Sequence, residues 1–232
     1  MSNYVVPPSP VATVAVAGTA ARYPVHRIYC VGRNYADHVR EMGADPRSEP
    51  PIFFMKPADA VIASGTEVPY PSRTKNFHYE AELVVALGRA GRATTRESAE
   101  SFVYGYAVGI DFTRRDLQAE AREGRRPWDV AKGFDHSAGI GPIQPLGSGA
   151  PRTTGRIRLT QNGVTRQDAD LADMIWSVAE VIRELSTYFE LAPGDLIYTG
   201  TPAGVGPLGI GDEVVATIDG LGETRHRIGA PR

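Results

Sequence analysis

The chain has 232 residues, of which 42% are apolar and 22% are charged, and this composition is that of a soluble globular protein with a core of its own. The formal net charge of −2 excludes a global positive field that would recruit nucleic acid or an anionic membrane. No segment approaches the roughly 20 consecutive apolar residues of a membrane-spanning helix, and the N-terminus lacks a basic region followed by an apolar core. We therefore expect a cytoplasmic protein.

Residues 1–24 are rich in Pro, Ala and Val and lack a helical period, which predicts an N-terminal arm that can include one strand. One domain is expected to follow, over residues 25–232. Residues 27–31 are predicted to form a buried strand that contains the single cysteine, Cys30; one cysteine excludes an internal disulfide and a Cys-based zinc site. After a turn, residues 35–42 are expected to form a short helix with Asn34 as its N-cap.

The remaining pattern predicts many short strands and few helices. Asn162-Gly163 between two strand-like runs is the signal of a two-residue type I′ hairpin. The 25 glycines and 18 prolines are spread along the whole chain, as expected for frequent turns. Together these features predict a β-rich α+β fold, either a sandwich or a roll. Strands are expected at residues 52–55, 67–70, 80–87, 103–110, 157–161, 164–167, 195–199 and 213–218, and helices at residues 95–101, 113–122 and 175–189.

Two glutamates begin the apolar strand at residues 80–87. In a strand, residues two apart share a face, so Glu80 and Glu82 are expected to stand side by side. Two adjacent carboxylates repel each other, and an apolar neighbourhood strengthens the repulsion. The repulsion requires protonation, a basic neighbour or a metal ion, and oxygen-only ligation suits Mg²⁺ or Mn²⁺. An exposed edge strand with two solvated glutamates is the alternative.

A third acid, Asp111, ends the strand predicted at residues 103–110. The residues that share its face are all small: Gly105, Ala107 and Gly109. We expect them to leave a cavity beside the acid, which suits a third metal ligand. Asp111 could equally be the N-cap of the helix predicted from Thr113.

His38 and Glu41 are three residues apart on the short helix predicted after Asn34. Residues at this spacing are neighbours on a helix, so Glu41 can accept a hydrogen bond from the imidazole of His38. A carboxylate on one ring nitrogen fixes the tautomer and raises the basicity of the other, as needed to take a proton from water. A surface pair is the alternative.

The glycine-rich segment at residues 199–211 follows a predicted strand. Such a loop exposes backbone N–H groups that can cradle a carboxylate, but it lacks the spacing and lysine of a phosphate loop. Lys56 and Lys132 each precede a turn-forming residue. They could anchor an anionic substrate or be solvated.

Taken in order, these segments resemble the fumarylacetoacetate hydrolase family from about residue 25 to residue 222. The resemblance implies the family's mixed β-sandwich roll and one Mg²⁺ or Mn²⁺ per subunit, held by Glu80, Glu82 and Asp111. It implies a catalytic His38–Glu41 pair with Lys132, substrate contacts through Arg33, Lys56, Arg115, Gln118 and Thr201, and a homodimer. The segments that carry it are 29–35 with His38 and Glu41, 53–57, 80–83, 109–111, 115–118, 131–134 and 194–206.

The short members of this family act on 2,4-dioxo acids, and the expected reaction is hydrolysis of the C–C bond of an acylpyruvate, with fumarylpyruvate from aromatic breakdown as the expected substrate. His38, held by Glu41, would take a proton from water, and hydroxide would add to the distal carbonyl. An oxaloacetate decarboxylase or a 2-oxo acid isomerase or tautomerase on the same site is the first alternative. A non-catalytic metal-binding protein of the same fold is the second.

Overall fold

The computed structural model describes residues 4–35 and 50–232. Its largest sheet has the strand order β4-β3-β15-β8-β9-β11-β5, with β12 paired beside β9. β15 is parallel to β3 and antiparallel to β8, so the centre of the sheet joins segments that are far apart in the chain. The strands of this sheet are β3 (Ile28–Gly32), β4 (Ile52–Lys56), β5 (Val61–Ala63), β8 (Ala81–Leu87), β9 (Val103–Asp111), β11 (Ala138–Ile140), β12 (Gln144–Pro145) and β15 (Leu196–Tyr198).

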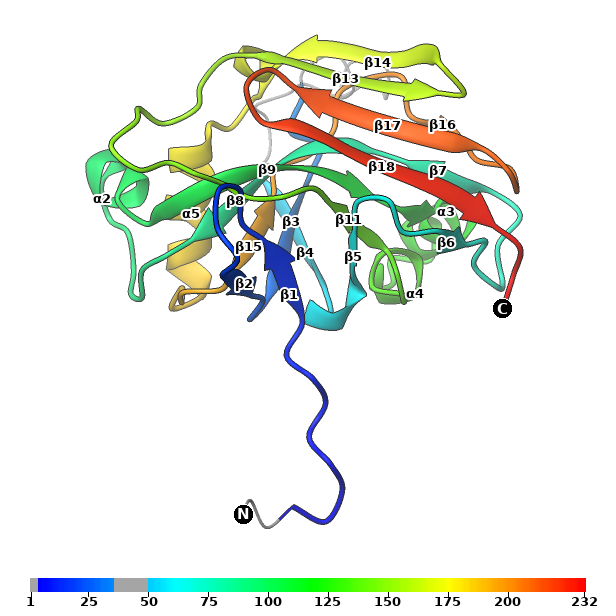
Figure 1. The fold of residues 1–232 in the computed structure, drawn as a ribbon, viewed down its shortest axis with the longest axis horizontal. Helices are drawn as coiled ribbons and strands as arrows, with labels where there is room; N and C mark the ends of the chain where they lie inside the picture. Colours follow the sequence, from blue (N-terminus) through cyan, green and yellow to red (C-terminus); the bar gives the residue numbers. More distant parts are fainter. Residues whose placement is uncertain (1–3, 36–49) are drawn as a thin grey trace.

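A second sheet of five strands, in the order β14-β13-β17-β18-β6, lies across the first. Figure 1 shows β13, β14, β17 and β18 as a separate layer above β8, β9 and β11. The strands of this layer are β6 (Val68–Pro69), β13 (Arg156–Gln161), β14 (Val164–Asp170), β17 (Glu213–Ile218) and β18 (Gly222–Gly229).

Smaller elements complete the described structure. The N-terminal strands β1 and β2 pair with each other, and the segment before β1 extends away from the body (Figure 1). A small sheet joins β7 to β10 and β16, and α5 lies on the opposite side of the molecule from α3 and α4 in Figure 1. The bounds are β1 (Thr13–Ala15), β2 (Arg22–Pro24), β7 (Phe77–Tyr79), β10 (Thr113–Arg114), β16 (Gly206–Pro207), α2 (Arg96–Glu100), α3 (Arg115–Glu123), α4 (Asp129–Lys132), α5 (Val178–Tyr188), and the 3₁₀ turns Ala58–Ala60 and Leu171–Asp173.

The central strand β8 is buried along its whole length because both of its faces are covered. Leu83 and Val85 point into the core between the two sheets, whereas Val84 and Ala86 point into a second core on the other face. Burial of one such side chain contributes about 1.5–3 kcal/mol. Since Glu82 alternates with Leu83, it faces the second core, and the glutamate therefore lies where water is excluded.

The prediction of a β-rich α+β fold is confirmed. The expected hairpin joins β13 to β14, and Asn162 and Gly163 have φ of 52° and 77°, as a type I′ turn requires. Cys30 is buried in β3, as expected. The strand expected at residues 67–70 is the edge strand β6. The short helix expected at residues 35–42 lies almost entirely outside the described residues.

Three expected elements differ from the structure. The helix predicted at residues 175–189 begins at Val178, because Ser177 and Glu180 form a capping box and the backbone of Ile175 bonds to Asn34 at 2.8 Å. The helix predicted from Thr113 begins at Arg115, because Thr113 and Arg114 pair with β7. The N-terminal arm contains two strands, where we expected one. The division of the chain at residue 24 stays a prediction.

β18, the longest strand of the second sheet, was not predicted from the sequence. Thr224, His226 and Ile228 are its inward residues, and arginines at positions 225 and 227 point outward. The alternation is present in the sequence, but threonine and histidine at inward positions conceal it. Among the described residues, no helix is long and apolar enough to cross a bilayer.

Candidate metal centre and pocket

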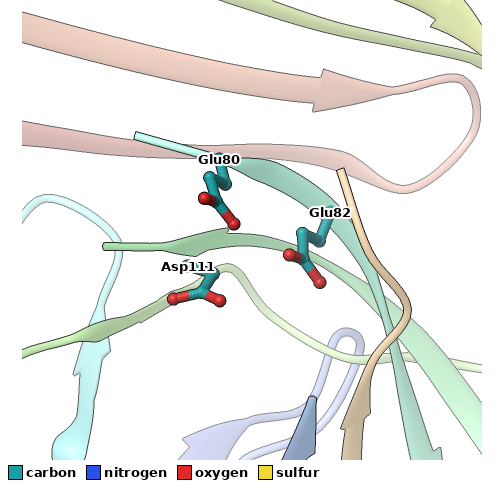
Figure 2. A group of neighbouring side chains, drawn as sticks. All are labelled: Glu80, Glu82 and Asp111. Atoms are coloured by element: carbon teal, nitrogen blue, oxygen red, sulfur yellow. The ribbon is translucent and has the colours of Figure 1, made fainter. Parts of the chain in front are cut away.

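Three acids meet where β8 begins and β9 ends. The two strands pair antiparallel with Ala81 opposite Ile110, and the backbone N–H of Asp111 donates to the carbonyl of Glu80 at 2.8 Å. One oxygen from each of Glu80, Glu82 and Asp111 lies within 4.8 Å of the other two. Figure 2 shows the three carboxylates reaching toward a common space. All three residues are buried.

Two buried lysines balance part of this negative charge. Lys132 Nζ donates to Glu80 Oε2 at 2.9 Å and to Asp111 Oδ2 at 2.8 Å. Burial alone would lower the pKa of Lys132, but the carboxylates of Asp111 and Glu80 outweigh burial and hold the pKa above its ordinary value. Lys56 Nζ lies 2.8 Å from Asp111 Oδ1 and donates to the carbonyl oxygens of Phe112 and Lys132. Lys132 is therefore charged, and both lysines hold Asp111 in place.

Arg115, the first residue of α3, reaches Glu80 from the other side. Its guanidinium donates to Glu80 Oε1 and to the side-chain oxygen of Gln118. Although burial raises the pKa of Glu80, the charges of Lys132 and Arg115 outweigh burial and hold that pKa far below its usual range. Glu80 is therefore ionised.

Glu82 is the acid that no cation contacts within the described residues. Its Oε2 accepts one hydrogen bond, from the backbone N–H of Gly200 at 2.7 Å. Burial, with the carboxylates of Asp111 and Glu80 close by, raises the pKa of Glu82 well above its usual value. Asp111 Oδ1 is ion-paired with Lys56 but accepts no hydrogen bond of good geometry in the described part of the chain, so it can still take a further partner.

These observations fit a hard divalent cation. The three ligand atoms are all oxygens, as Mg²⁺ and Mn²⁺ prefer. Glu82 accepts one hydrogen bond, and Asp111 Oδ1 accepts none of good geometry among the described residues. Both carboxylates can therefore still coordinate a cation. A bound cation would supply the positive charge that Glu82 lacks.

A cavity of about 620 Å³ opens beside the acid cluster. At its inner end it reaches Glu80 and Lys132, and its walls come from β3, β4, α3 and the loop after β15. The lining residues are Val31, Gly32, Arg33, Phe54, His78, Glu80, Arg115, Gln118, Ala119, Arg122, Glu123, Trp128, Lys132, Thr201 and Val205.

Four of the five residues predicted to contact substrate line this cavity: Arg33, Arg115, Gln118 and Thr201. The fifth, Lys56, lies behind Asp111, where its side chain is fully buried. Lys132, predicted as catalytic, lines the cavity beside Glu80. The predicted pair His38 and Glu41 lies outside the described residues.

Several local expectations about the acids and lysines are wrong. Asp111 is not a helix N-cap, because α3 starts four residues later, with Arg114 in the cap position. The small residues of β9 leave no cavity, since a Cβ on Gly109 would lie 2.4 Å from Val84 and 2.7 Å from Tyr198. Neither lysine is solvated.

Two polar residues at the site were not singled out from the sequence. His78 lines the cavity and lies 2.8 Å from Asn76 through Nε2 and 3.5 Å from Arg115 through Nδ1. Burial, followed by the charge of Arg115, lowers the pKa of His78 to about 4, so its ring is neutral at neutral pH. A neutral ring that donates to Asn76 can accept from Arg115. Its alternation with Glu80 was the signal that could have found it.

Gln167 is the second. Its fully buried amide accepts from the backbone N–H of Ala81 at 2.9 Å and donates to Thr201 Oγ1 at 2.8 Å and to the carbonyl of Pro202 at 2.9 Å. It therefore joins the acid-bearing strand to the glycine-rich loop. No local pattern in the sequence marks this role, because the three partners come from distant segments.

Comparisons with known proteins agree with this geometry. Residues 27–229 match the family described as "Fumarylacetoacetate (FAA) hydrolase C-terminal". A fumarylpyruvate hydrolase of Ralstonia sp is 43% identical over 185 residues, which are 80% of this chain and 96% of that protein. An oxaloacetate tautomerase of Escherichia coli (strain K12) is 39% identical over 205 residues, which are 88% of this chain and 93% of that protein.

A solved structure is also similar over nearly the full length. The crystal structure of a fumarylpyruvate hydrolase from Pseudomonas aeruginosa in complex with Mn²⁺ and pyruvate has a TM-score of 0.95 and 50% sequence identity. The match covers 98% of this chain and 100% of that one. The similarity confirms the overall fold expected from the sequence.

Proposed function

The chain belongs to the fumarylacetoacetate hydrolase family, and from that premise we propose that it is a divalent-metal-dependent hydrolase of acylpyruvates. The favoured substrate is fumarylpyruvate, which would yield fumarate and pyruvate. The observation that carries the proposal is the cluster of three buried carboxylates at the inner end of the cavity. Two fumarylpyruvate hydrolases that resemble the chain support the choice of substrate.

Glu80, Glu82 and Asp111 would hold one Mg²⁺ or Mn²⁺ per subunit. When bound, the cation would supply Lewis-acid stabilisation of negative charge on the 2-oxo oxygen of the substrate. Lys56 would hold Asp111 in place, and Lys132 would fix Glu80 and Asp111 relative to each other. Support comes from the neighbouring fumarylpyruvate hydrolase, whose structure holds Mn²⁺ and pyruvate.

The remaining roles are proposed for side chains that line the cavity and for the pair outside the described residues. Arg33, Arg115, Gln118 and Thr201 would bind and orient the substrate, whose carboxylate and oxo groups accept hydrogen bonds. His38, held by Glu41, would take a proton from water, and the resulting hydroxide would add to the distal carbonyl carbon. Lys132 or Gln118 would donate a hydrogen bond to the developing oxyanion. The C–C bond would then break, and its electron pair would stay on the pyruvate portion. The proton taken from water would return to that carbon, so that fumarate and pyruvate are released.

Oxaloacetate tautomerisation is the second candidate function, because a tautomerase is among the relatives. Decarboxylation of oxaloacetate would use the same site. Neither reaction needs an activated water. The predicted His38–Glu41 pair therefore favours hydrolysis. A non-catalytic metal-binding protein is disfavoured, since every position expected to act in catalysis carries the expected residue type.

In the test, the purified protein is loaded with Mn²⁺. It is then assayed with fumarylpyruvate, acetylpyruvate and oxaloacetate, one substrate at a time. We expect fumarate and pyruvate to form in equal amounts from fumarylpyruvate. The His38→Ala variant should retain the fold, as judged by circular dichroism, and lose this activity. Interconversion of oxaloacetate tautomers with no pyruvate formed from either acylpyruvate would overturn the proposal in favour of the second candidate.

The biological setting is part of the same proposal. We expect a cytoplasmic homodimer that acts on a small 2,4-dioxo acid in the breakdown of aromatic compounds. The support is the resemblance to fumarylpyruvate hydrolases alone. Size-exclusion chromatography with light scattering measures the oligomeric state directly.

A further inference from the structure

One helical face forms a long wall of the cavity. Arg115, Gln118, Ala119, Arg122 and Glu123 of α3 all line it, and their spacings of three, four, seven and eight residues are those of a single face. Arg115 contacts Glu80 at the inner end. Arg122 is seven residues further along, and a helix rises about 10 Å over that interval. The cavity therefore extends along α3, with Arg122 at the end remote from Glu80.

Two aromatic rings, those of Phe54 and Trp128, form a second wall of the cavity. Lys132 Nζ, at the inner end, lies 5.0 Å from the centre of the Phe54 ring. The Phe54 ring in turn lies 5.6 Å from the ring of Trp128, which follows the loop after α3. Val31, Ala119 and Val205 add apolar surface to the lining. The middle of the cavity therefore suits a hydrocarbon segment.

The charges at the two ends of the cavity differ in their pairing. Lys132 and Arg115 are both engaged by Glu80. Arg122 has no ion pair or side-chain hydrogen bond with any described residue, and the same holds for the acid beside it, Glu123. A guanidinium with free donors is suited to bind a carboxylate with two parallel hydrogen bonds.

We propose that Arg122 binds a second, distal carboxylate of the substrate and so selects acylpyruvates whose acyl group ends in an acid. This inference rests on the proposed function and assigns Arg122 a role in specificity. The dioxo end lies at the acid cluster, the hydrocarbon segment lies along Phe54 and Trp128, and the terminal carboxylate meets Arg122. Glu123 weakens the local positive field, so the selection depends on direct contact with Arg122.

The experiment compares two substrates in two variants. Fumarylpyruvate carries the distal carboxylate and acetylpyruvate lacks it. In Arg122→Ala we expect the ratio of kcat/KM for fumarylpyruvate over acetylpyruvate to fall about 10- to 100-fold, mostly through KM, as for loss of a hydrogen bond to a charged group. The ratio for Arg122→Lys should lie between the ratios for the unmodified protein and Arg122→Ala, because lysine keeps the charge but loses the bidentate geometry.

Arg125→Gln is the matched control. It removes the same charge from the turn just after α3, at a position that does not line the cavity. We expect the ratio of kcat/KM for the two substrates to stay within about twofold of that of the unmodified protein, because salt largely screens an exposed charge outside the cavity. A similar fall in both variants would reduce the effect to general electrostatics and overturn the proposal.

The remaining outcomes separate this inference from the proposed function. If the unmodified protein hydrolyses both substrates and Arg122→Ala leaves the ratio unchanged, or lowers both rates equally, the inference is wrong and the hydrolase stands. If the unmodified protein hydrolyses neither compound, the hydrolase is wrong. The two compounds then serve as stable ligands, and calorimetry of the Mn²⁺-loaded protein measures their affinities. An equal ratio of affinities with and without Arg122, or no binding, would then overturn the inference.

Discussion

Two buried acids lie close to the two ends of the short strand β15. The described residues compensate the charge of one of them far more fully than that of the other. Asp195, just before the strand, accepts from Arg27 at 2.9 and 2.7 Å, from the backbone N–H of Ala192 at 2.9 Å, and contacts His26 at 2.8 Å. Glu82, beside the residues that follow the strand, accepts one backbone hydrogen bond and has two acids as neighbours.

The difference separates an acid that maintains the fold from one that is available for chemistry. A buried charge is tolerated when cations and hydrogen bonds compensate it, and Asp195 has both. No cation of the described residues contacts Glu82, so a proton or a bound ion must complete the compensation. A buried acid with a strongly perturbed pKa beside a cavity is a candidate for function for this reason.

The largest expected effect comes from replacing the uncompensated acid. Glu82→Gln should lower the turnover of fumarylpyruvate at least ~10³-fold, since a bound cation contributes several kcal/mol to stabilising the transition state. The same variant should be as stable as the unmodified protein without metal, or more so, because one of three mutually repelling carboxylates is gone. Steady-state kinetics and urea unfolding in the presence of a chelator measure the two effects.

Metal binding gives an independent readout for Glu82→Gln. Mn²⁺ at 100 times its Kd should raise the free energy of unfolding of the unmodified protein by about 2.7 kcal/mol. The variant should show almost none of this gain at the same concentration. An equal gain in both proteins would remove Glu82 from the proposed metal site.

Replacement of the compensated acid should have the reverse pattern. Asp195→Asn should lower the free energy of unfolding by about 2–4 kcal/mol, because Arg27 loses its charged partner at a partly buried site. The folded variant should still bind Mn²⁺ and turn over substrate at close to the original rate per folded molecule. Urea unfolding measures the stability, and titration with Mn²⁺ measures the metal affinity. A loss of metal affinity in Asp195→Asn would contradict the assignment of Asp195 to the fold alone.

The smallest expected effect concerns His226, which is buried and has no carboxylate partner among the described residues. Its ring contacts the Thr66 carbonyl at 3.0 Å and Thr224 Oγ1 at 3.1 Å, and it packs edge-on against Phe112. Burial lowers the pKa of His226 in the folded protein, so the unfolded chain takes up a proton first as the pH falls.

The sign of the pH effect follows from that order of protonation. Above the unfolded pKa of about 6.5 both states are neutral, and below it stability declines by up to about 1.4 kcal/mol per pH unit, down to the folded pKa. The unmodified protein should therefore lose about 1 kcal/mol more stability than His226→Gln between pH 7.5 and pH 5.5. Urea unfolding at the two pH values measures this double difference; equal losses would show that His226 does not resist protonation.

Much of the architecture could be predicted from local patterns. The alternation of β8, the Asn162-Gly163 turn and the apolar stripe of α5 each report a local backbone geometry, and each element is present. The same alternation placed Glu80 and Glu82 on one face. The inward threonine and histidine of β18 show where such patterns fail, because burial there depends on partners in other segments.

By itself, the sequence determined which segments extend, where they turn and which acids share a face, because these properties depend on residues within a few positions of one another. Only the tertiary structure decided that Lys56 and Lys132 neutralise Asp111, that Gln167 joins β8 to the loop after β15, and that Arg122 remains unpaired in the described residues. Those relations depend on the order of strands in the sheets, which brings together residues that are far apart in the chain. The local conformational preferences of the residues do not specify that order.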